Sequence, residues 1–258
     1  MRLPLRILLG IGFAATLATA SAAEHLAVAA AANLVYVLEP LNAAFARSEP
    51  GVTVTREIGA SGSLVAQIEN GAPFDVFLSA DLDFPRKLVQ AGGAQGSSVA
   101  VFAIGKLVLW TTRPGLDLSS VAAVVRDPGV KRLAIANPQT APYGRAALEA
   151  LAKLGLSAEA RPKLVTGENI TQTAQYVFSG NVDAGFVALS LVLSPKLRDK
   201  GRWIEVPAGL YAPIEQGSVL TNRGASNPAA RRYLDFLRSA EARRIFAKFG
   251  YGLVAPKP

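Results

Sequence analysis

The chain has 258 residues, a formal net charge of +8, a hydrophobic fraction of 50% and an aromatic fraction of 7%. It has no cysteine, which excludes a disulfide framework, thiolate metal sites and a cysteine nucleophile. Its one histidine, His25, lies near the amino terminus, so neither a Ser-His-Asp triad nor a histidine-ligated metal site is expected. The basic residues are scattered and do not cluster with aromatic side chains, which argues against nucleic-acid binding.

The first residues have the pattern of an export signal. Arg2 and Arg6 form a positively charged region, and residues 7–17 form an apolar stretch that is short for a membrane-spanning helix. Small residues follow at 20–23, which places a cleavage site after Ala22 or Ala23. An uncleaved membrane anchor is the alternative. We expect residues 1–23 to be a cleaved signal peptide and the mature protein to be soluble and periplasmic.

Apolar spacing in the first part of the mature chain predicts strands that alternate with helices. The predicted elements are a strand at 26–30, a helix at 34–45, a strand at 52–55, a helix at 64–68 that stops at Asn70-Gly71, and a buried strand at 75–79. This order predicts a parallel sheet with right-handed crossovers, in which the successive loops gather at one edge.

The alternation starts again after Gly105. Strands are predicted at 107–111, 133–136, 184–188 and 203–206, and helices at 143–155, 169–178, 227–239 and 240–249. Two such units predict two lobes, one of residues 24–103 plus 212–258 and one of residues 104–211. Short extended segments at 101–105 and 211–215 are expected to connect them. Trp110 and Trp203 lie in apolar strand contexts and are both predicted to be core residues.

Two small polar turns precede predicted helices in the first unit. A helix amino terminus presents unpaired backbone N–H groups, which favour an anion. In the first turn Asn33 can donate to an anion from its side chain and backbone, or act as a plain helix cap. In the turn Gly59-Ala60-Ser61-Gly62-Ser63, Ser61 is the candidate ligand residue and Gly62 allows close backbone approach, although an ordinary turn has the same composition.

Two further turns of this kind occur in the second unit. Residues 137–144 read NPQTAPYG, and the Tyr143 phenol is either a neutral donor that points inward or a ring that packs beside the loop. In the turn at 167–172 the backbone N–H groups of Asn169 and Ile170 begin a helix, and Glu168 interacts with the helix dipole. No lysine or arginine lies between Gly59 and Asp81, so an anion there would be held by neutral donors.

Four segments together resemble the periplasmic molybdate-binding proteins of ABC transporters. They are AAAANL (29–34), GASGSLVAQIENGAPFDVFLSAD (59–81), NPQTAPYGRAALEAL (137–151) and GENITQTAQYVFSGNVDAGFVALS (167–190). The most specific part is the pattern GAP-x-D-[VL]-F-x-SAD, and the similarity extends over essentially the whole mature chain. The resemblance implies a two-lobed (type II) periplasmic binding protein of the α/β class. Each lobe would be a mainly parallel sheet flanked by helices, with an oxyanion in the cleft between the lobes.

The resemblance also implies a ligand set. It consists of Asn33 with the backbone of Ala32, Ser61, Tyr143 and the backbone N–H of Ile170, which hold molybdate through hydrogen bonds and do not coordinate the metal. Many members of the family have serine at the position of Asn33 and a ligand tyrosine at the position of Ala188. In a subgroup with the same APYG loop the tyrosine comes from that loop, so Tyr143 replaces the missing hydroxyl.

The function that follows is capture of molybdate, and of tungstate comparably, for delivery to a membrane permease with its cytoplasmic ATPase. A monomer without cofactor, enzymatic activity or nucleic-acid partner is expected. A receptor for another oxyanion such as sulfate, or for a small organic acid, is the alternative binding function. An organic acid would favour an arginine in the cleft, and only Arg145 lies near a predicted turn. An exported hydrolase and a ligand-sensing regulatory domain are further alternatives. The hydrolase lacks a usable histidine and a GxSxG motif.

Overall fold

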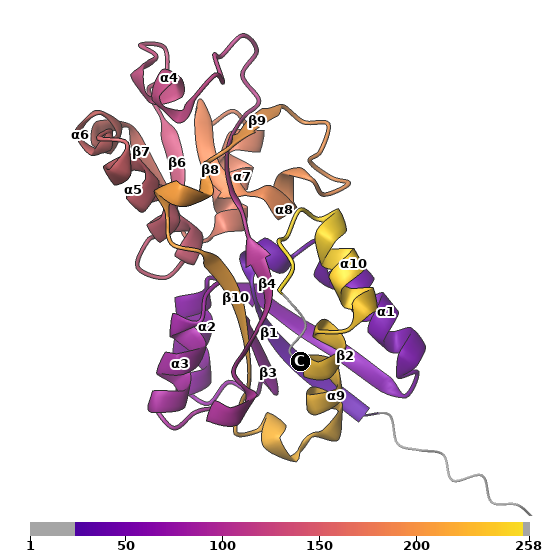
Figure 1. The fold of residues 1–258 in the computed structure, drawn as a ribbon. Coiled ribbons are helices and arrows are strands. Elements are labelled where there is room, and N and C mark those ends of the chain that lie inside the picture. Colours follow the sequence, from indigo (N-terminus) through magenta and orange to yellow (C-terminus); the bar gives the residue numbers. More distant parts are fainter. Residues whose placement is uncertain (1–23, 255–258) are drawn as a thin grey trace, which may run out of the picture.

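The computed structural model describes residues 24–254, so the predicted signal peptide lies outside the described part. Figure 1 shows two α/β units, each built on a five-stranded sheet, with strand orders β2-β1-β3-β10-β4 and β7-β6-β8-β5-β9. The predicted two-lobed α/β class is confirmed. Within residues 24–254, no helix combines the length and apolar character that crossing a membrane requires.

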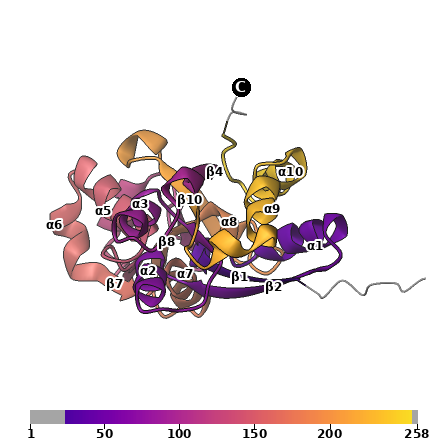
Figure 2. The ribbon, with the colours of Figure 1, turned by 90° about the horizontal axis from the view of Figure 1, so that it is seen from below.

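The first sheet has helices on both faces. Its strands are β1 (Glu24–Ala31), β2 (Val52–Gly59), β3 (Val76–Ser79), β4 (Ala100–Gly105) and β10 (Ile214–Leu220). The helices of this unit are α1 (Leu38–Ser48), α2 (Ser61–Glu69), α3 (Asp83–Gln90), α9 (Pro228–Leu237) and α10 (Ala240–Lys248). Because strand side chains alternate, Val28 and Ala30 pack with α1, α9 and α10, whereas Ala29 packs with α2 and α3. Figure 2 shows these two groups of helices on opposite sides of the sheet.

The second sheet repeats this plan. Its strands are β5 (Leu107–Thr111), β6 (Leu133–Ala136), β7 (Leu164–Gly167), β8 (Ala184–Ala188) and β9 (Arg202–Glu205). The helices of this unit are α4 (Val121–Arg126), α5 (Pro142–Lys153), α6 (Ser157–Ala160), α7 (Ile170–Phe178) and α8 (Leu189–Val192). Short 3₁₀ helices complete the described chain: η1 (Ala32–Leu34), η2 (Gly96–Ser98), η3 (Arg161–Lys163), η4 (Ala208–Leu210) and η5 (Gly224–Ser226).

Both sheets are mixed, whereas mainly parallel sheets were expected. In the first sheet β1 runs parallel to β2 and β3, and β10 runs antiparallel to β3 and β4. In the second sheet β6 runs parallel to β7 and β8, and β5 runs antiparallel to β8 and β9. Every antiparallel pairing in the two sheets involves β5 or β10. These are the strands that the chain enters after each of the two connections between the units.

Trp203 is a correction to the predicted core. Trp110 is buried in β5 as expected, but Trp203 is 37% exposed. The two residues are register partners, and β9, which carries Trp203, is an edge strand of the second sheet. Apolar character in a short strand predicts membership of a sheet, but only the strand order decides which strand lies at the edge.

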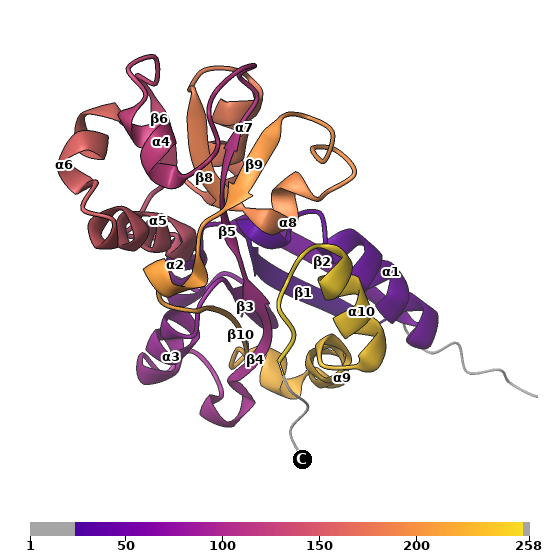
Figure 3. The same ribbon diagram turned by 45° about the horizontal axis from the view of Figure 1, so that its top comes forward.

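The two connections between the units lie side by side. The chain leaves the first sheet after Gly105, enters the second at Leu107, and returns between η4 and β10 (Figure 3). The Leu107 N–H donates a 3.1 Å hydrogen bond to the Tyr211 hydroxyl, and Gly105 is the register partner of Ile214. The expected connecting segments 101–105 and 211–215 therefore belong partly to the paired strands β4 and β10.

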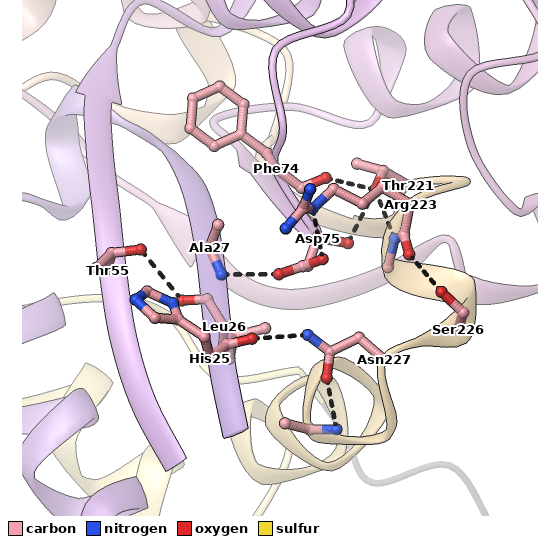
Figure 4. Close-up of polar contacts among 12 residues, drawn as sticks. His25, Leu26, Ala27, Thr55, Phe74, Asp75, Thr221, Arg223, Ser226 and Asn227 are labelled. Carbon is pink, nitrogen blue, oxygen red and sulfur yellow. Dashed lines mark hydrogen bonds and ion pairs between the residues drawn. The ribbon is translucent and has the colours of Figure 1, made fainter. Parts of the chain in front are cut away.

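A buried carboxylate fixes the end of the first sheet that lies away from these connections (Figure 4). Asp75 Oδ2 accepts a 2.8 Å hydrogen bond from the Ala27 N–H, and Asp75 Oδ1 accepts one of 3.2 Å from Arg223 Nε. The Asp75 carbonyl accepts from the N–H of Thr221, and the Asn227 side chain donates to the His25 carbonyl. These bonds attach the segment that follows β10 to β1 and β3.

Candidate functional site

The four predicted turns follow the carboxyl ends of parallel strands in the two sheets. Two of them follow β1 and β2 of the first sheet, and two follow β6 and β7 of the second. The turns of one unit contact those of the other in two pairs. The Gly62 N–H donates to the Thr140 carbonyl at 2.9 Å, and the Thr171 hydroxyl donates to the Ala32 carbonyl at 2.9 Å. The candidate site therefore lies where the sheets face each other, as expected for loops at the carboxyl edge of parallel strands.

Asn33 is buried in η1 and does not cap a helix with its side chain. Its Nδ2 donates to Gln216 Oε1 at 2.7 Å and to the Tyr251 hydroxyl at 2.9 Å, while its carbonyl accepts from the Ser190 hydroxyl at 2.9 Å. The Asn33 Oδ1 atom is buried and has no hydrogen-bond partner within the described residues. Both amide protons are thus committed to the protein, and Asn33 does not have the cap geometry that was its alternative role.

Ser61 is the first residue of α2 and is buried. Its Oγ accepts a 3.0 Å hydrogen bond from the Ala80 N–H. Because this bond uses the oxygen as an acceptor, the hydroxyl proton remains available to another group. A side chain at Gly62 would come within about 3.0 Å of the Phe84 ring and the Thr140 Cα, so glycine permits the close approach of the two turns.

Tyr143 lies in the first turn of α5, where Pro142 occupies the first helical position. Its ring belongs to the core of the second unit, and its hydroxyl is buried without a partner among residues 24–254. Burial raises the pKa of the Tyr143 hydroxyl well above its ordinary value of 10.0, and Tyr251 and Tyr211 raise it further. The hydroxyl therefore stays protonated and is a neutral donor.

The backbone of Ile170 begins α7. The Asn169 side chain caps this helix, because its Oδ1 accepts from the N–H groups of Thr171 and Gln172 at 3.0 Å each. That arrangement leaves the Ile170 N–H outside the cap, since the first N–H groups of a helix have no intrahelical partner. Glu168 is exposed to solvent.

Arg145 does not supply a free charge to this region. Its guanidinium forms an ion pair with Asp81 and lies 3.7 Å from Asp83, both of which belong to the first unit. It also lies over the Phe84 ring, 5.6 Å from the centroid. The one arginine near a predicted turn is therefore paired across the gap, and the groups of the candidate site are neutral.

Three buried polar residues at the site were not predicted from the sequence. Ser190, Gln216 and Tyr251 surround Asn33, and Ala188, which precedes α8, is fully buried opposite Leu107. Gln216 lies in the largely buried strand β10, and a polar residue inside a buried strand needs a hydrogen-bond partner, which is a signal that sequence reading could have used. The partners of Tyr251, in contrast, are 218 and 61 residues away along the chain.

Residues 26–252 match the family model described as bacterial extracellular solute-binding protein. The chain belongs to this family. It is 42% identical to the molybdate-binding protein ModA of Azotobacter vinelandii over 248 residues, which cover 96% of this chain and 97% of that protein. It is 43% identical to ModA of Rhodobacter capsulatus, with 91% of each chain covered.

A solved structure supports the same assignment. The periplasmic molybdate-binding protein of Azotobacter vinelandii superposes with a TM-score of 0.83 at 37% identity, covering 90% of this chain and all of that one. The family consists of exported solute-binding proteins, and the expectation of a binding protein that is not an enzyme is confirmed by that membership.

Proposed function

We propose that this protein captures molybdate between its two lobes and delivers it to an ABC importer. The observation that carries the proposal is the Tyr143 hydroxyl, a buried, protonated donor without a partner in the described chain, which lies beside Gly105 and the Gln216 side chain. Two relatives that are 42% and 43% identical over more than nine-tenths of the chain are named molybdate-binding proteins.

The chemistry of the turns suits a fully deprotonated oxyanion. Molybdate has no proton to donate near neutral pH, so it is recognised by donors alone. We assign this role to the hydroxyls of Ser61 and Tyr143 and to the backbone N–H groups of Ala32, Asn33 and Ile170. Each hydrogen bond to a charged group contributes about 1.5–3 kcal/mol. After desolvation and lobe closure, a net binding free energy of about −8 to −12 kcal/mol is expected, which corresponds to micromolar to nanomolar affinity.

The donors come from two lobes, which we place at residues 24–103 plus 212–258 and at residues 104–211. A ligand that contacts both lobes stabilises the closed form relative to the open form, since only the closed form makes all the contacts. The hydrogen bonds from Gly62 to Thr140 and from Thr171 to Ala32 support a closed arrangement of this kind. The importer's membrane component would then recognise the closed form.

Export, partners and ligand range complete the proposal. Residues 1–23 would be a signal peptide that is cleaved on the way to the periplasm. The mature monomer would deliver its ligand to a membrane permease with a cytoplasmic ATPase, and it would need no cofactor. Tungstate, which is nearly the same size as molybdate, would bind comparably. Sulfate has the same charge and shape as molybdate, so only the size of the cavity would reject it.

Titration calorimetry of the mature chain with molybdate, tungstate, sulfate and phosphate tests the proposal. We expect micromolar or tighter binding of molybdate and tungstate, and binding of sulfate and phosphate that is weaker by at least a hundredfold. Tight sulfate binding without a molybdate response would overturn the proposal and favour the alternative of another oxyanion receptor.

A further inference from the structure

A cluster of four buried polar side chains joins the two lobes beside the candidate site. We call Asn33, Ser190, Gln216 and Tyr251 the hinge junction; each is at most 4% exposed. Asn33, Gln216 and Tyr251 belong to the first unit, and Ser190 lies in α8 of the second. The Tyr251 hydroxyl lies 3.0 Å from the Asn33 carbonyl oxygen and 3.1 Å from Ser190 Oγ. It therefore contacts a residue of each lobe.

The backbone around Tyr251 holds this hydroxyl in place. Gly250 adopts a φ of 77° that ends α10, and the Tyr251 N–H donates to the Phe246 carbonyl at 3.2 Å. Gly252 then exchanges two 2.8 Å hydrogen bonds with Ile104 of β4. The Tyr251 ring also packs edge-on against Phe246, with 5.5 Å between the centroids. The position of the hydroxyl is thus determined by its own lobe and does not depend on the contact with Ser190.

The orientation of the Asn33 amide follows from its neighbours. Gln216 Nε2 donates to the carbonyls of Ile214 at 3.1 Å and Ala80 at 3.4 Å, so Gln216 Oε1 must face Asn33. Asn33 Nδ2 consequently points to Gln216 Oε1 and to the Tyr251 hydroxyl oxygen. The Tyr251 hydroxyl accepts a hydrogen bond from the Asn33 amide. It donates its own proton to the Asn33 carbonyl or to Ser190 Oγ. Tyr251 and Gln216 together hold the turn that contains the proposed backbone donors Ala32 and Asn33.

Opening of the lobes affects only part of this junction. The bonds of Ser190 to the Asn33 carbonyl and to the Tyr251 hydroxyl join the two units, so we expect them to break when the lobes separate, whereas the bonds among Asn33, Gln216 and Tyr251 stay within one lobe. A contact made only in the closed form shifts the equilibrium toward that form, and ligand affinity follows the population of the closed form.

We infer that Tyr251 is a positioning residue that couples the first anion-binding turn to lobe closure through Ser190. It acts without touching the ligand. This inference rests on the proposed function for the identity of the ligand, molybdate, but the effect on closure is independent of it. Loss of the Tyr251 hydroxyl would free the Asn33 amide and remove one of the bonds that exist only in the closed form.

Molybdate calorimetry on Tyr251→Phe, Ser190→Ala and the double variant tests the coupling. We expect each single variant to weaken affinity about 5- to 20-fold. The double variant should lose less than the product of the two factors, because both changes break the same junction. Tyr233→Phe is the matched control. Its buried hydroxyl donates to Asn42 Oδ1 at 2.7 Å within the first lobe, so the affinity should stay within twofold of the wild type.

A measurement without ligand separates this inference from the proposed function. Since the chain has no cysteine, Glu69→Cys on α2 and Ala152→Cys on α5 allow specific spin labelling of two exposed positions, one in each lobe. We expect Tyr251→Phe to shift the distance distribution of the unliganded protein toward the open form, and Tyr233→Phe to leave it unchanged. The inference would be overturned if Tyr251→Phe kept both the molybdate affinity and the distance distribution of the wild type. It would also be overturned if Tyr233→Phe weakened affinity and shifted the distances as much as Tyr251→Phe does. Failure of the wild type to bind molybdate would overturn the proposed function alone.

Discussion

Two of the side chains that we propose as ligand donors, Ser61 and Tyr143, are buried and keep a hydroxyl proton available. The Ser61 oxygen is occupied as an acceptor by the Ala80 N–H, which leaves the proton for another group, and the Tyr143 hydroxyl has no partner among the described residues. A buried polar group without a partner costs about 1–3 kcal/mol. Such a cost is expected where a ligand supplies the missing partner.

Removal of the two hydroxyls is the direct test of the proposed donors. Ser61→Ala combined with Tyr143→Phe should weaken molybdate binding at least tenfold, because two charge-assisted hydrogen bonds are lost. Calorimetry measures the change. Ser226→Ala combined with Tyr233→Phe makes the same chemical changes away from the gap and should leave affinity unchanged. An unchanged affinity in the first pair would remove both residues from the site.

The Tyr143 hydroxyl explains why residue 105 is a glycine. A side chain at Gly105 would overlap the Tyr143 hydroxyl and would lie 2.8 Å from Gln216 Nε2. Gly105→Ala should therefore displace Tyr143 or Gln216 and weaken molybdate binding at least tenfold. Gly209→Ala is the control, because open space surrounds that position. Equal affinity in both variants would show that the Tyr143 hydroxyl is not held where binding requires it.

Burial of tyrosine hydroxyls predicts a loss of stability at high pH. Burial raises the pKa of Tyr143, Tyr233 and Tyr251 above the ordinary value of 10.0 in the folded state. Below pH 10 both states hold these protons, and stability is complete. Above pH 10 the unfolded state releases them first, so each tyrosine lowers the free energy of unfolding by about 1.4 kcal/mol per pH unit. Urea unfolding from pH 8 to 11 should show a shallower decline for Tyr143→Phe; parallel curves would contradict the assignment.

Among the elements, the proposed donors lie at four helix or 3₁₀ starts, of which only that of α7 has a side-chain cap. Asn169 caps α7 with its side chain, whereas Ala60 precedes α2 and Ala141 precedes α5 without a side-chain cap. The uncapped starts leave N–H groups for other partners, one of which, that of Gly62, reaches Thr140 across the gap. We expect the cap of α7 to orient the neighbouring Ile170 N–H.

The cap of α7 is therefore expected to affect both stability and binding. Asn169→Ala should lower the free energy of unfolding by about 1 kcal/mol and weaken molybdate binding several-fold, since the Ile170 N–H loses its orientation. Asn227→Ala removes a cap of the same kind from α9, away from the gap. It should cost comparable stability in urea unfolding with no change in calorimetric affinity. A binding loss shared by both variants would show that the effect of Asn169 is not local.

At the scale of the whole molecule, contacts at both sides of the gap hold the two units together. The hinge junction lies on one side, and the ion pair between Arg145 and Asp81 lies beside α3. The Arg145 side chain is partly exposed, so its pair with Asp81 contributes only about 0.2–1 kcal/mol and is screened by salt.

The ion pair between Arg145 and Asp81 is expected to stabilise the closed form slightly, by an amount that falls with salt concentration. Arg145→Met should weaken molybdate binding by up to about fivefold at low ionic strength, which corresponds to the upper end of about 0.2–1 kcal/mol for a pair of this kind. The difference from the wild type should vanish in high salt. Arg126→Met is the control, because Arg126 pairs with Glu159 inside the second unit. Calorimetry at two salt concentrations measures both, and a salt-independent difference would indicate a packing effect in place of the ion pair.

The sequence predicted elements best where a strand is buried by its own composition. The strands 107–111, 133–136 and 184–188 have the predicted bounds, and the helix predicted at 169–178 begins one residue later. The helices α3, α4, α6 and α8 and the strands β4, β7 and β10 were not predicted as such. β10 contains Glu215, Gln216 and Gly217, which disturb the apolar pattern, and its two antiparallel neighbours come from distant parts of the chain.

The order of residues alone predicts the two α/β units, the four turns at the carboxyl ends of strands, and the absence of basic residues from the segment 59–81. These features depend on local spacing and composition, which the order of residues contains directly. Three features are visible only in the folded structure. The turns meet in two pairs, Arg145 is neutralised by Asp81, and Asn33 is surrounded by Ser190, Gln216 and Tyr251. Hydrogen bonds between residues 64 to 218 positions apart have no periodic trace in the chain, because the packing of whole sheets brings such partners together.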